Sequence, residues 1–156
     1  MRVLSIFAAV AMVVSLAVFE GSTAIAAPPV AVSIRIMPTT FFPVEAGTWS
    51  ASGAITDSGT YVRTEFDGTG SLPDCFCPPV HTGAFREVFL LTGSKGTLTI
   101  SEEALQKPGG GFGLVTGVWE IAVGTGGYDR ASGHGTDEFN GPTLTLVLTG
   151  VIGKAD

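Results

Sequence analysis

Residues 84–101, AFREVFLLTGSKGTLTIS, decide the fold class of this chain. In the second half of this stretch Leu98 and Ile100 share one face, while Thr97, Thr99 and Ser101 share the other. Alternation with a period of two is typical of a half-buried β-strand. Two such runs joined by the short connection Gly-Ser-Lys-Gly predict a β-hairpin.

The same pattern recurs through the chain after Pro28, and glycines repeatedly interrupt it. The further strands that we expect cover residues 30–37, 47–56, 60–66, 117–123, 127–136 and 143–152. About eight strands with short connections predict an all-β fold, a single antiparallel eight-stranded up-and-down β-barrel of the calycin-like kind. A two-sheet β-sandwich is the alternative. Only residues 102–107, EEALQK, have a helix-forming composition, and we expect one helical turn there.

The N-terminal residues have the composition of a secretory signal peptide. Arg2 precedes an apolar run over residues 3–19, and the small-residue sequence Ala24-Ile25-Ala26 follows before Pro28. Glu20 interrupts the apolar run, which disfavours a membrane anchor. We therefore expect cleavage after Ala26, a single domain over residues 27–156, and a secreted protein that is extracellular or periplasmic.

Composition limits the partners of the expected domain. The formal net charge is -6, and no cluster of Lys and Arg is present to neutralise phosphates, so we expect no nucleic-acid partner. We also expect no membrane association after cleavage, while a homo-oligomer is left open. Residues 124–136, GTGGYDRASGHGT, lack the Gly-Lys-Ser/Thr ending of a phosphate-binding loop, so we interpret them as a turn and a bent strand. No cofactor is expected.

The sequence over residues 117–136, GVWEIAVGTGGYDRASGHGT, with the upstream LTGSKGTLTI, resembles a known pattern. It is similar to the Gly-x-Trp-x-Ile-x-x-Gly-Thr-Gly-x-Tyr arrangement of secreted bacterial proteins with an allene oxide cyclase-like barrel, relatives of the plant dirigent proteins. The resemblance covers roughly residues 47–150 and rests on glycines and core aromatic residues. It implies an eight-stranded barrel with a central apolar cavity, of a kind that plant enzymes of the group shape around hydrophobic substrates. None of the catalytic residues of those enzymes maps onto this chain.

One carboxyl group is placed among apolar side chains by the alternation. Glu87 shares a face with Phe85, Phe89 and Leu91. In an apolar lumen such a group would have a raised pKa and could act as an acid or as a polar anchor for a ligand. The alternative is a hydrated position at the mouth of the barrel. The residues that we expect to line a ligand-binding lumen are Trp49, Phe66, Phe89 and Trp119.

Other polar residues give weaker signals. His81 and His134 are accompanied by no Gly-x-Ser-x-Gly motif, which disfavours a hydrolytic triad. Asp137 and Glu138 are adjacent, and adjacent strand residues point to opposite faces, so we interpret them as a solvated charge pair and not as a catalytic dyad. Glu120 alternates with Trp119 and Ile121, and we expect it outside.

The two cysteines lie in a proline-rich segment, residues 72–81, LPDCFCPPVH. Export would place Cys75 and Cys77 in an oxidising environment, so a disulfide between them is the simplest hypothesis. A bond between positions i and i+2 closes a strained ring, and free or intermolecular thiols are the first alternative. A metal site with His81 is the second, but its spacing is unlike that of zinc sites, and we expect no metal.

Three functions are compatible with these observations. The first is a secreted barrel that binds a small hydrophobic molecule. The second is a cyclase or isomerase that shapes its cavity around a hydrophobic substrate and uses Glu87 as its polar group. The third is a structural or interaction protein with a lumen filled by side chains.

Overall fold

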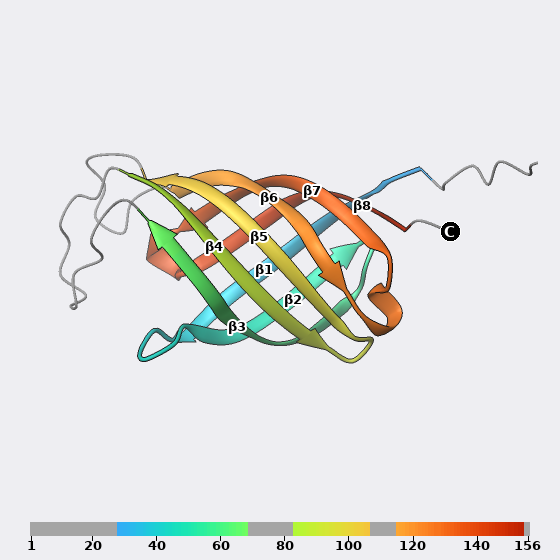
Figure 1. The fold of residues 1–156 in the computed structure, drawn as a ribbon, viewed down its shortest axis with the longest axis horizontal. Helices are drawn as coiled ribbons and strands as arrows, with labels where there is room; N and C mark the ends of the chain where they lie inside the picture. The colour runs from blue at the N-terminus through green and yellow to red at the C-terminus, as the bar shows by residue number, and fades with distance from the viewer. Residues whose placement is uncertain (1–27, 69–82, 107–114, 155–156) are drawn as a thin grey trace, which may run out of the picture.

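The computed structural model describes residues 28–68, 83–106 and 115–154, which form a closed antiparallel barrel (Figure 1). Each strand pairs with the next along the chain, and β8 pairs back onto β1, so the predicted up-and-down barrel is confirmed and the sandwich is not formed. The strands are β1 (Val30–Thr40), β2 (Ala46–Gly53), β3 (Asp57–Gly68), β4 (Gly83–Gly93), β5 (Thr97–Gln106), β6 (Val115–Gly124), β7 (Ala131–Asn140) and β8 (Thr145–Lys154).

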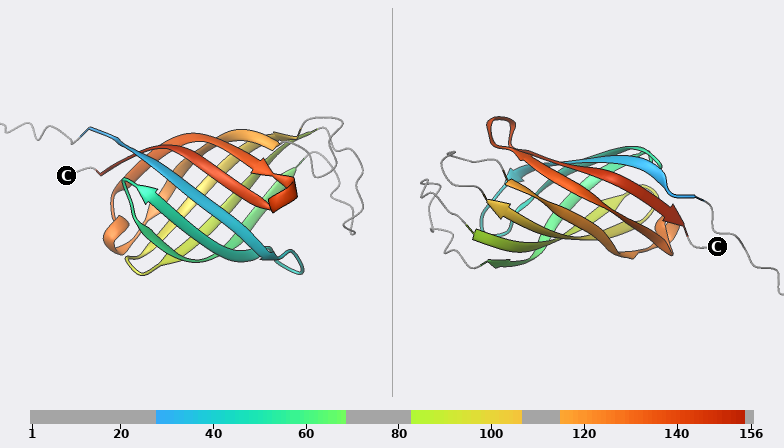
Figure 2. Two further views of the ribbon diagram at one scale, coloured as in Figure 1. Left: turned by 180° about the vertical axis from the view of Figure 1, so that it is seen from behind. Right: turned by 90° about the horizontal axis from the view of Figure 1, so that it is seen from above.

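The barrel is elongated and has two different ends (Figures 1 and 2). At the end that we call the turn end, short connections join β2 to β3 and β4 to β5, and the short 3-10 helix η1 (Gly126–Tyr128) joins β6 to β7. At the opposite end, the loop end, residues 41–45 join β1 to β2, and a second short 3-10 helix, η2 (Gly141–Thr143), joins β7 to β8. No helix within the described residues is long and apolar enough to cross a membrane.

The lumen near the turn end is filled by large apolar side chains. The indole Nε1 of Trp49 donates a hydrogen bond to the carbonyl oxygen of Thr92 at 3.1 Å, and that of Trp119 donates to the carbonyl oxygen of Thr136 at 3.2 Å. Each buried indole therefore has a partner for its one polar atom. The most deeply buried residues of this core include Trp49, Trp119, Leu91, Leu98, Ile100 and Leu148.

A carboxylate ties the connections at the turn end together. Asp57, the first residue of β3, accepts hydrogen bonds from the Tyr128 hydroxyl at 2.6 Å and the Ser94 hydroxyl at 2.8 Å, and from the backbone N–H of Lys95 at 3.2 Å. The hydrogen bond from Tyr128, with those from Ser94, holds the pKa of Asp57 well below its usual range. One side chain thus joins the start of β3, the β4–β5 turn and η1.

The structure corrects one prediction about secondary structure. Residues 102–106 are not helical but continue β5, where they pair with both β4 and β6. Pairing on both sides satisfies their backbone groups and outweighs the intrinsic helical preference of Glu, Ala and Leu. The consequence for the lumen is large, because the strand alternation turns Glu102 inward, where it is 2% exposed.

The glycine-rich segment after β6 forms the expected turn and strand. Gly126 has a positive φ of 61°, and a Cβ at this position would lie 2.6 Å from the carbonyl oxygen of Lys95. The backbone of η1 therefore packs directly on the β4–β5 turn, which explains a glycine here. The rest of the segment continues into β7.

Candidate functional site

The half of the lumen nearer the loop end contains a cavity of about 150 Å³. Strands on all sides contribute to its wall, together with the connection between β1 and β2. Its apolar lining includes Ile36, Phe85, Phe89, Phe139 and Leu146. Three carboxyl groups, those of Glu45, Glu87 and Glu102, also line it.

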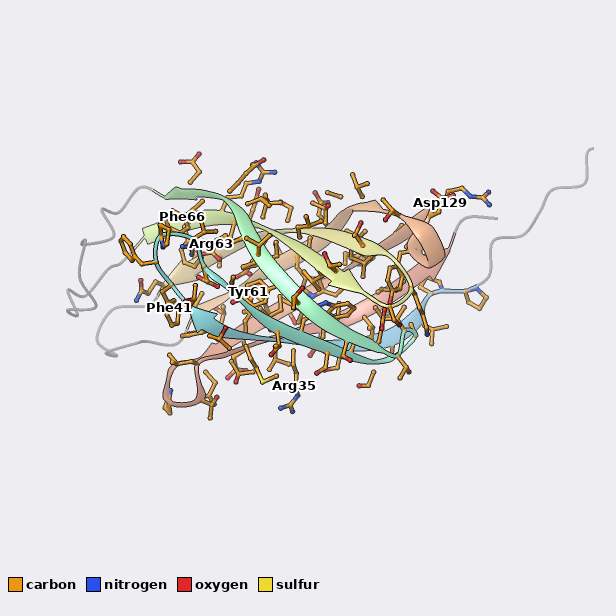
Figure 3. All side chains as sticks on the ribbon, turned by 90° about the horizontal axis from the view of Figure 1, so that it is seen from below. Arg35, Phe41, Tyr61, Arg63, Phe66 and Asp129 are labelled. Atoms are coloured by element: carbon orange, nitrogen blue, oxygen red, sulfur yellow. The ribbon has the colours of Figure 1, made fainter. Side chains whose placement is uncertain are left out.

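A cluster of polar side chains lies beside this cavity on β3. Arg63 Nη1 lies 2.9 Å from Glu45 Oε2 and 3.0 Å from Glu87 Oε1, and the Tyr61 hydroxyl donates to Glu45 Oε1 at 2.9 Å. In Figure 3, Arg63 and Phe66 lie toward the loop end of the barrel, and Asp129 lies at the turn end. The guanidinium group of Arg63 therefore forms ion pairs with two carboxyl groups that are both mostly buried.

An irregularity in β3 places Phe66 on the lumen side together with Arg63. Arg63 pairs with Phe89 and Glu65 pairs with Val88, so the register shifts by one residue between them. Beyond the shift Phe66 pairs with Glu87, whose side chain faces the lumen. The Arg63 guanidinium lies 5.0 Å from the centre of the Phe66 ring, a cation–π distance. A regular two-residue alternation would place Phe66 and Arg63 on opposite faces of β3, and the bulge brings them to the same face.

Burial dominates the electrostatics of Glu87. Its removal from water raises its pKa to about 7, although the neighbouring Arg63 acts in the opposite direction. Burial and the charge of Glu45 likewise raise the pKa of Tyr61 above its usual range. Glu87 therefore changes its protonation state near neutral pH, on the wall of the cavity.

A second pair of carboxyl groups faces the lumen without any basic partner. Glu102 on β5 and Asp137 on β7 are 2% and 4% exposed, respectively. Glu102 Oε2 and both carboxyl oxygens of Asp137 find no donor group among the other described residues. Burial and then the charge of Asp137 raise the pKa of Glu102 well above its usual range, and burial also raises that of Asp137. The pair therefore holds a proton to higher pH than two exposed carboxyl groups would, in the hydrogen bond between Glu102 and Asp137.

A glycine on the strand between them makes room for this pair. Gly117 on β6 pairs with Ala104 on one side and with Asp137 on the other. A Cβ on Gly117 would lie 2.6 Å from Asp137 Oδ1 and 2.3 Å from the carbonyl oxygen of Glu103. Both distances are shorter than van der Waals contact, so this position requires glycine for the carboxyl group to lie over β6.

The interpretation of Asp137 and Glu138 as a solvated charge pair was wrong for Asp137. Glu138 is exposed, as expected, but Asp137 is turned into the lumen by the strand alternation. The carboxyl pair that does form joins residues 35 positions apart, because β6 pairs with β5 on one side and with β7 on the other.

The predicted lumen residues are distributed over both halves of the barrel. Phe89 lines the cavity, and Phe66, with 37% of its surface exposed, stacks on Phe85 of the cavity wall. Trp49 and Trp119 also face the lumen, but they belong to its filled half. Sequence reasoning found Glu87 but missed Glu45, Tyr61, Arg63, Glu102 and Asp137.

The remaining candidates that the structure describes, Glu120 and His134, are exposed outside this site. The exposure of Glu120 was predicted, and His134 lies on β7. Cys75, Cys77 and His81 lie outside the described residues. Within the described ranges, no group of three or more His, Cys, Asp or Glu side chains is placed to hold a metal ion.

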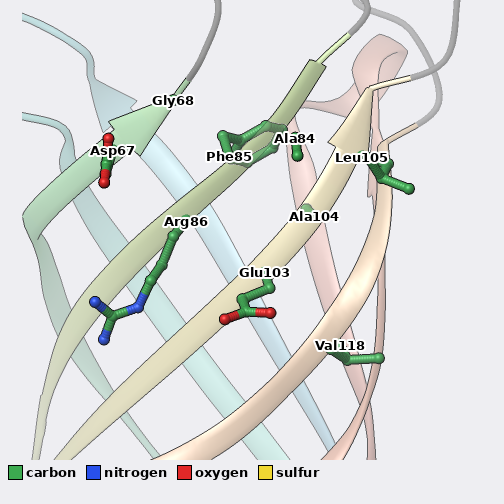
Figure 4. Close-up of a pocket in the computed structure, with 9 residues that line it drawn as sticks. All are labelled: Asp67, Gly68, Ala84, Phe85, Arg86, Glu103, Ala104, Leu105 and Val118. Atoms are coloured by element: carbon green, nitrogen blue, oxygen red, sulfur yellow. The ribbon is translucent and has the colours of Figure 1, made fainter.

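A larger hollow of about 500 Å³ lies on the outer surface of β3 to β6 (Figure 4). Its side chains Arg86, Glu103, Leu105 and Val118 are exposed. A ligand there would keep much of its surface in water, whereas small-molecule sites normally bury most of their ligand. The lumen cavity is therefore the stronger candidate site.

The fold and this cavity define the chain as an eight-stranded antiparallel β-barrel with a polar internal site. No protein-family model matches the chain, and no curated protein or solved structure matches it with significance.

Proposed function

We propose that this protein binds a small, largely apolar molecule in the cavity near the loop end of its barrel. The observation that carries the proposal is the cavity of about 150 Å³, lined mainly by apolar side chains, in a barrel whose other half is filled. A cavity of this size with an apolar lining holds a molecule about as large as benzene. A ligand of one ring with a short substituent fits these dimensions.

The cost of an empty cavity supports binding over a purely structural role. Protein interiors are close-packed and contain few voids larger than a water molecule. The apolar wall of this space of about 150 Å³ loses packing free energy wherever no atoms lie against it. Filling by a ligand would recover part of that free energy, whereas a structural barrel gains nothing from leaving the space open.

Titration with toluene, followed by calorimetry, tests the proposal. Leu146→Phe would place a larger side chain in the cavity, while Val147→Phe makes the same kind of change on the other face of β8. We expect the Val147→Phe protein to bind toluene like the unmodified protein, and Leu146→Phe to weaken binding at least about tenfold, or about 1.4 kcal/mol. Equal affinities in both variants would contradict the proposal, and so would absence of binding of toluene together with its alcohol and amine analogues.

A second candidate function is isomerisation or cyclisation of a hydrophobic substrate in the same cavity. The observation that favours it is Glu87, which lines the cavity and has a pKa of about 7, close to the value that suits a general acid or base at neutral pH. Glu87→Gln should then abolish conversion of an unsaturated substrate small enough for this cavity, without abolishing its binding. Unchanged turnover in that variant would rule out this role for Glu87.

We also propose membership of the allene oxide cyclase-like group of secreted barrels. The resemblance over residues 47–150 supports this, and a closed eight-stranded barrel is the fold it implies. Circular dichroism and a solved structure of a protein that carries the same glycine–tryptophan pattern would test it. A different strand order in such a protein would contradict the assignment.

Export with cleavage after Ala26 is a further proposal, supported by the order of basic, apolar and small residues at the N-terminus. An intact mass spectrum of the protein from its own host should correspond to residues 27–156. If Cys75 and Cys77 are bonded, the mass is lower by the pair of hydrogen atoms that the bond removes. A mass that includes residues 1–26 would contradict export by this route.

A further inference from the structure

The lumen near the loop end has more carboxyl groups than basic groups to pair with them. Among the described residues that face it, four are acidic, namely Glu45, Glu87, Glu102 and Asp137, and Arg63 is basic. Arg63 lies within 3.0 Å of both Glu45 and Glu87, so its charge is shared by these two. Glu102 and Asp137 are left without a cation.

The oxygens of this second pair find no donor group among the other described residues, and the hydrogen bond that joins the two carboxyl groups to each other requires a proton on one of them. Glu102 is 2% exposed and lines the cavity, yet its Oε2 has no such donor, and the same holds for both oxygens of Asp137. An isolated buried carboxylate is strongly destabilising, so the pair retains a proton instead. Burial and the charge of Asp137 raise the pKa of Glu102 accordingly.

The other described strands around Glu102 and Asp137 provide no basic side chain to pair with these two carboxyl groups. On β3, Tyr61 and Arg63 are engaged with Glu45 and Glu87, and Glu87 itself adds negative charge from β4. The strands β1, β6 and β8 face the lumen with apolar residues such as Ile36, Trp119 and Leu148. No basic side chain of the described residues is therefore left to pair with Glu102 and Asp137, and a ligand that enters the cavity would supply the positive charge.

We propose that the ligand of this cavity is a small hydrophobic amine whose ammonium group binds the Glu102 carboxylate and takes the place of the proton shared with Asp137. This inference rests on the proposed binding function and specifies its ligand class. A hydroxyl group could donate a hydrogen bond to the same oxygens, but it would leave the negative charge uncompensated. An ammonium group supplies both the hydrogen bonds and the charge.

Proton release to the solvent accompanies such binding. The protonated Glu102 carboxyl group loses its proton, the ammonium group remains charged, and the carboxylate and the ammonium form an ion pair. Exchange of one proton makes the affinity for the amine rise by about tenfold per pH unit wherever Glu102 is protonated in the free protein. A neutral ligand of the same shape should show no such dependence.

Calorimetric titration with benzylamine, benzyl alcohol and toluene distinguishes binding of an ammonium group from binding of a hydroxyl group or of an apolar ring alone. The three molecules share one aromatic ring and differ in the substituent. Measurements at about pH 5, 6 and 7, in buffers with different heats of ionisation, count the protons released. Glu102→Gln removes the charge at nearly constant size. Glu103→Gln is the matched control, since Glu103 is the next residue of β5 and is exposed on the outer surface.

The expected result is that benzylamine binds at least about tenfold more tightly than benzyl alcohol at pH 7, with affinity rising with pH and a proton released. Glu102→Gln should abolish this preference, and Glu103→Gln should retain it. Binding of toluene with no preference for benzylamine and no proton release would overturn the inference while leaving the proposed function intact. Failure of all three molecules to bind the unmodified protein would overturn the proposed function, and this inference with it.

Discussion

The two halves of one lumen differ sharply, although the same eight strands build both. Near the turn end, residues such as Leu91, Leu98 and Leu148 fill the lumen and are inaccessible to solvent. Near the loop end, the same strands present Glu87, Glu102 and Leu146 to a cavity. A change of four positions along β4, from Leu91 to Glu87, leads from the filled core to the polar site.

This difference shows how a small barrel can hold a destabilising site. Buried carboxyl groups and an open cavity both reduce stability. The filled half, with two buried indoles and the Asp57 hydrogen bonds at the turn end, can offset that loss. Closure of the sheet helps as well, because the backbone of each strand is paired on both sides along the barrel.

The largest expected effect compares two leucines on the inner face of β8. Leu148 is completely buried in the filled half, whereas Leu146 lines the cavity. Leu148→Ala should lower the free energy of unfolding by about 3–5 kcal/mol, since it opens a new void in a packed core. Leu146→Ala should cost only about 2 kcal/mol, because its side chain already borders empty space.

Urea denaturation of the two variants, monitored by tryptophan fluorescence, measures both values. An equal loss of stability in Leu148→Ala and Leu146→Ala would mean that the cavity is closed in solution. The distinction between the two halves of the lumen would then disappear.

The next effect is the pH dependence of stability, which has opposite signs in the two halves. In the loop half, the pKa of Glu87 is raised from 4.5 to about 7, so between these values the folded protein binds more protons than the unfolded chain. Stability therefore falls as the pH rises from about 5 to about 8, by on the order of 3 kcal/mol for Glu87 alone. In the turn half, the lowered pKa of Asp57 has the reverse effect, and its stabilisation is lost only as the pH falls below the ordinary Asp range.

Urea denaturation at about pH 5 and pH 8 checks this slope. Glu87→Gln should flatten it in part, leaving the contribution of Glu102, whose pKa is also raised. A protein that becomes more stable from pH 5 to pH 8 would show that the carboxyl groups of the loop half are hydrated.

The features of the structure that could be predicted from the sequence are those that follow from the alternation of apolar and polar residues within one strand. A period of two is visible in residues 84–101 without any knowledge of the fold, and it placed Glu87 and Phe89 on one face correctly. Glycine-containing connections likewise predicted where strands turn. Eight short strands joined in this way left few alternatives to a closed barrel.

The positions of Phe66, Glu102 and Asp137 could not be predicted, because they depend on how neighbouring strands pair and in which register. A one-residue shift in β3 moved Phe66 to the face of Arg63, and nothing in the local alternation reveals it. The lumen position of Glu102 was missed because the composition of EEALQK favours a helix. Pairing with β4 and β6 makes Glu102 a strand residue instead. Asp137 becomes the neighbour of Glu102 across Gly117 of β6, which requires the registers of both the β5–β6 and the β6–β7 pairs.

The smallest expected effect compares two tyrosines, one in each half. The Tyr128 hydroxyl donates to Asp57 at the turn end, and the Tyr61 hydroxyl donates to Glu45 beside the cavity. Removal of either hydroxyl, in Tyr128→Phe or Tyr61→Phe, should cost about 1 kcal/mol, the net value of one side-chain hydrogen bond. Only Tyr61→Phe should also change the affinity for toluene, because Glu45 lines the cavity and loses its donor. Calorimetry on both variants tests this, and an equal change of affinity in Tyr128→Phe would mean that the filled half does not isolate the turn end from the site.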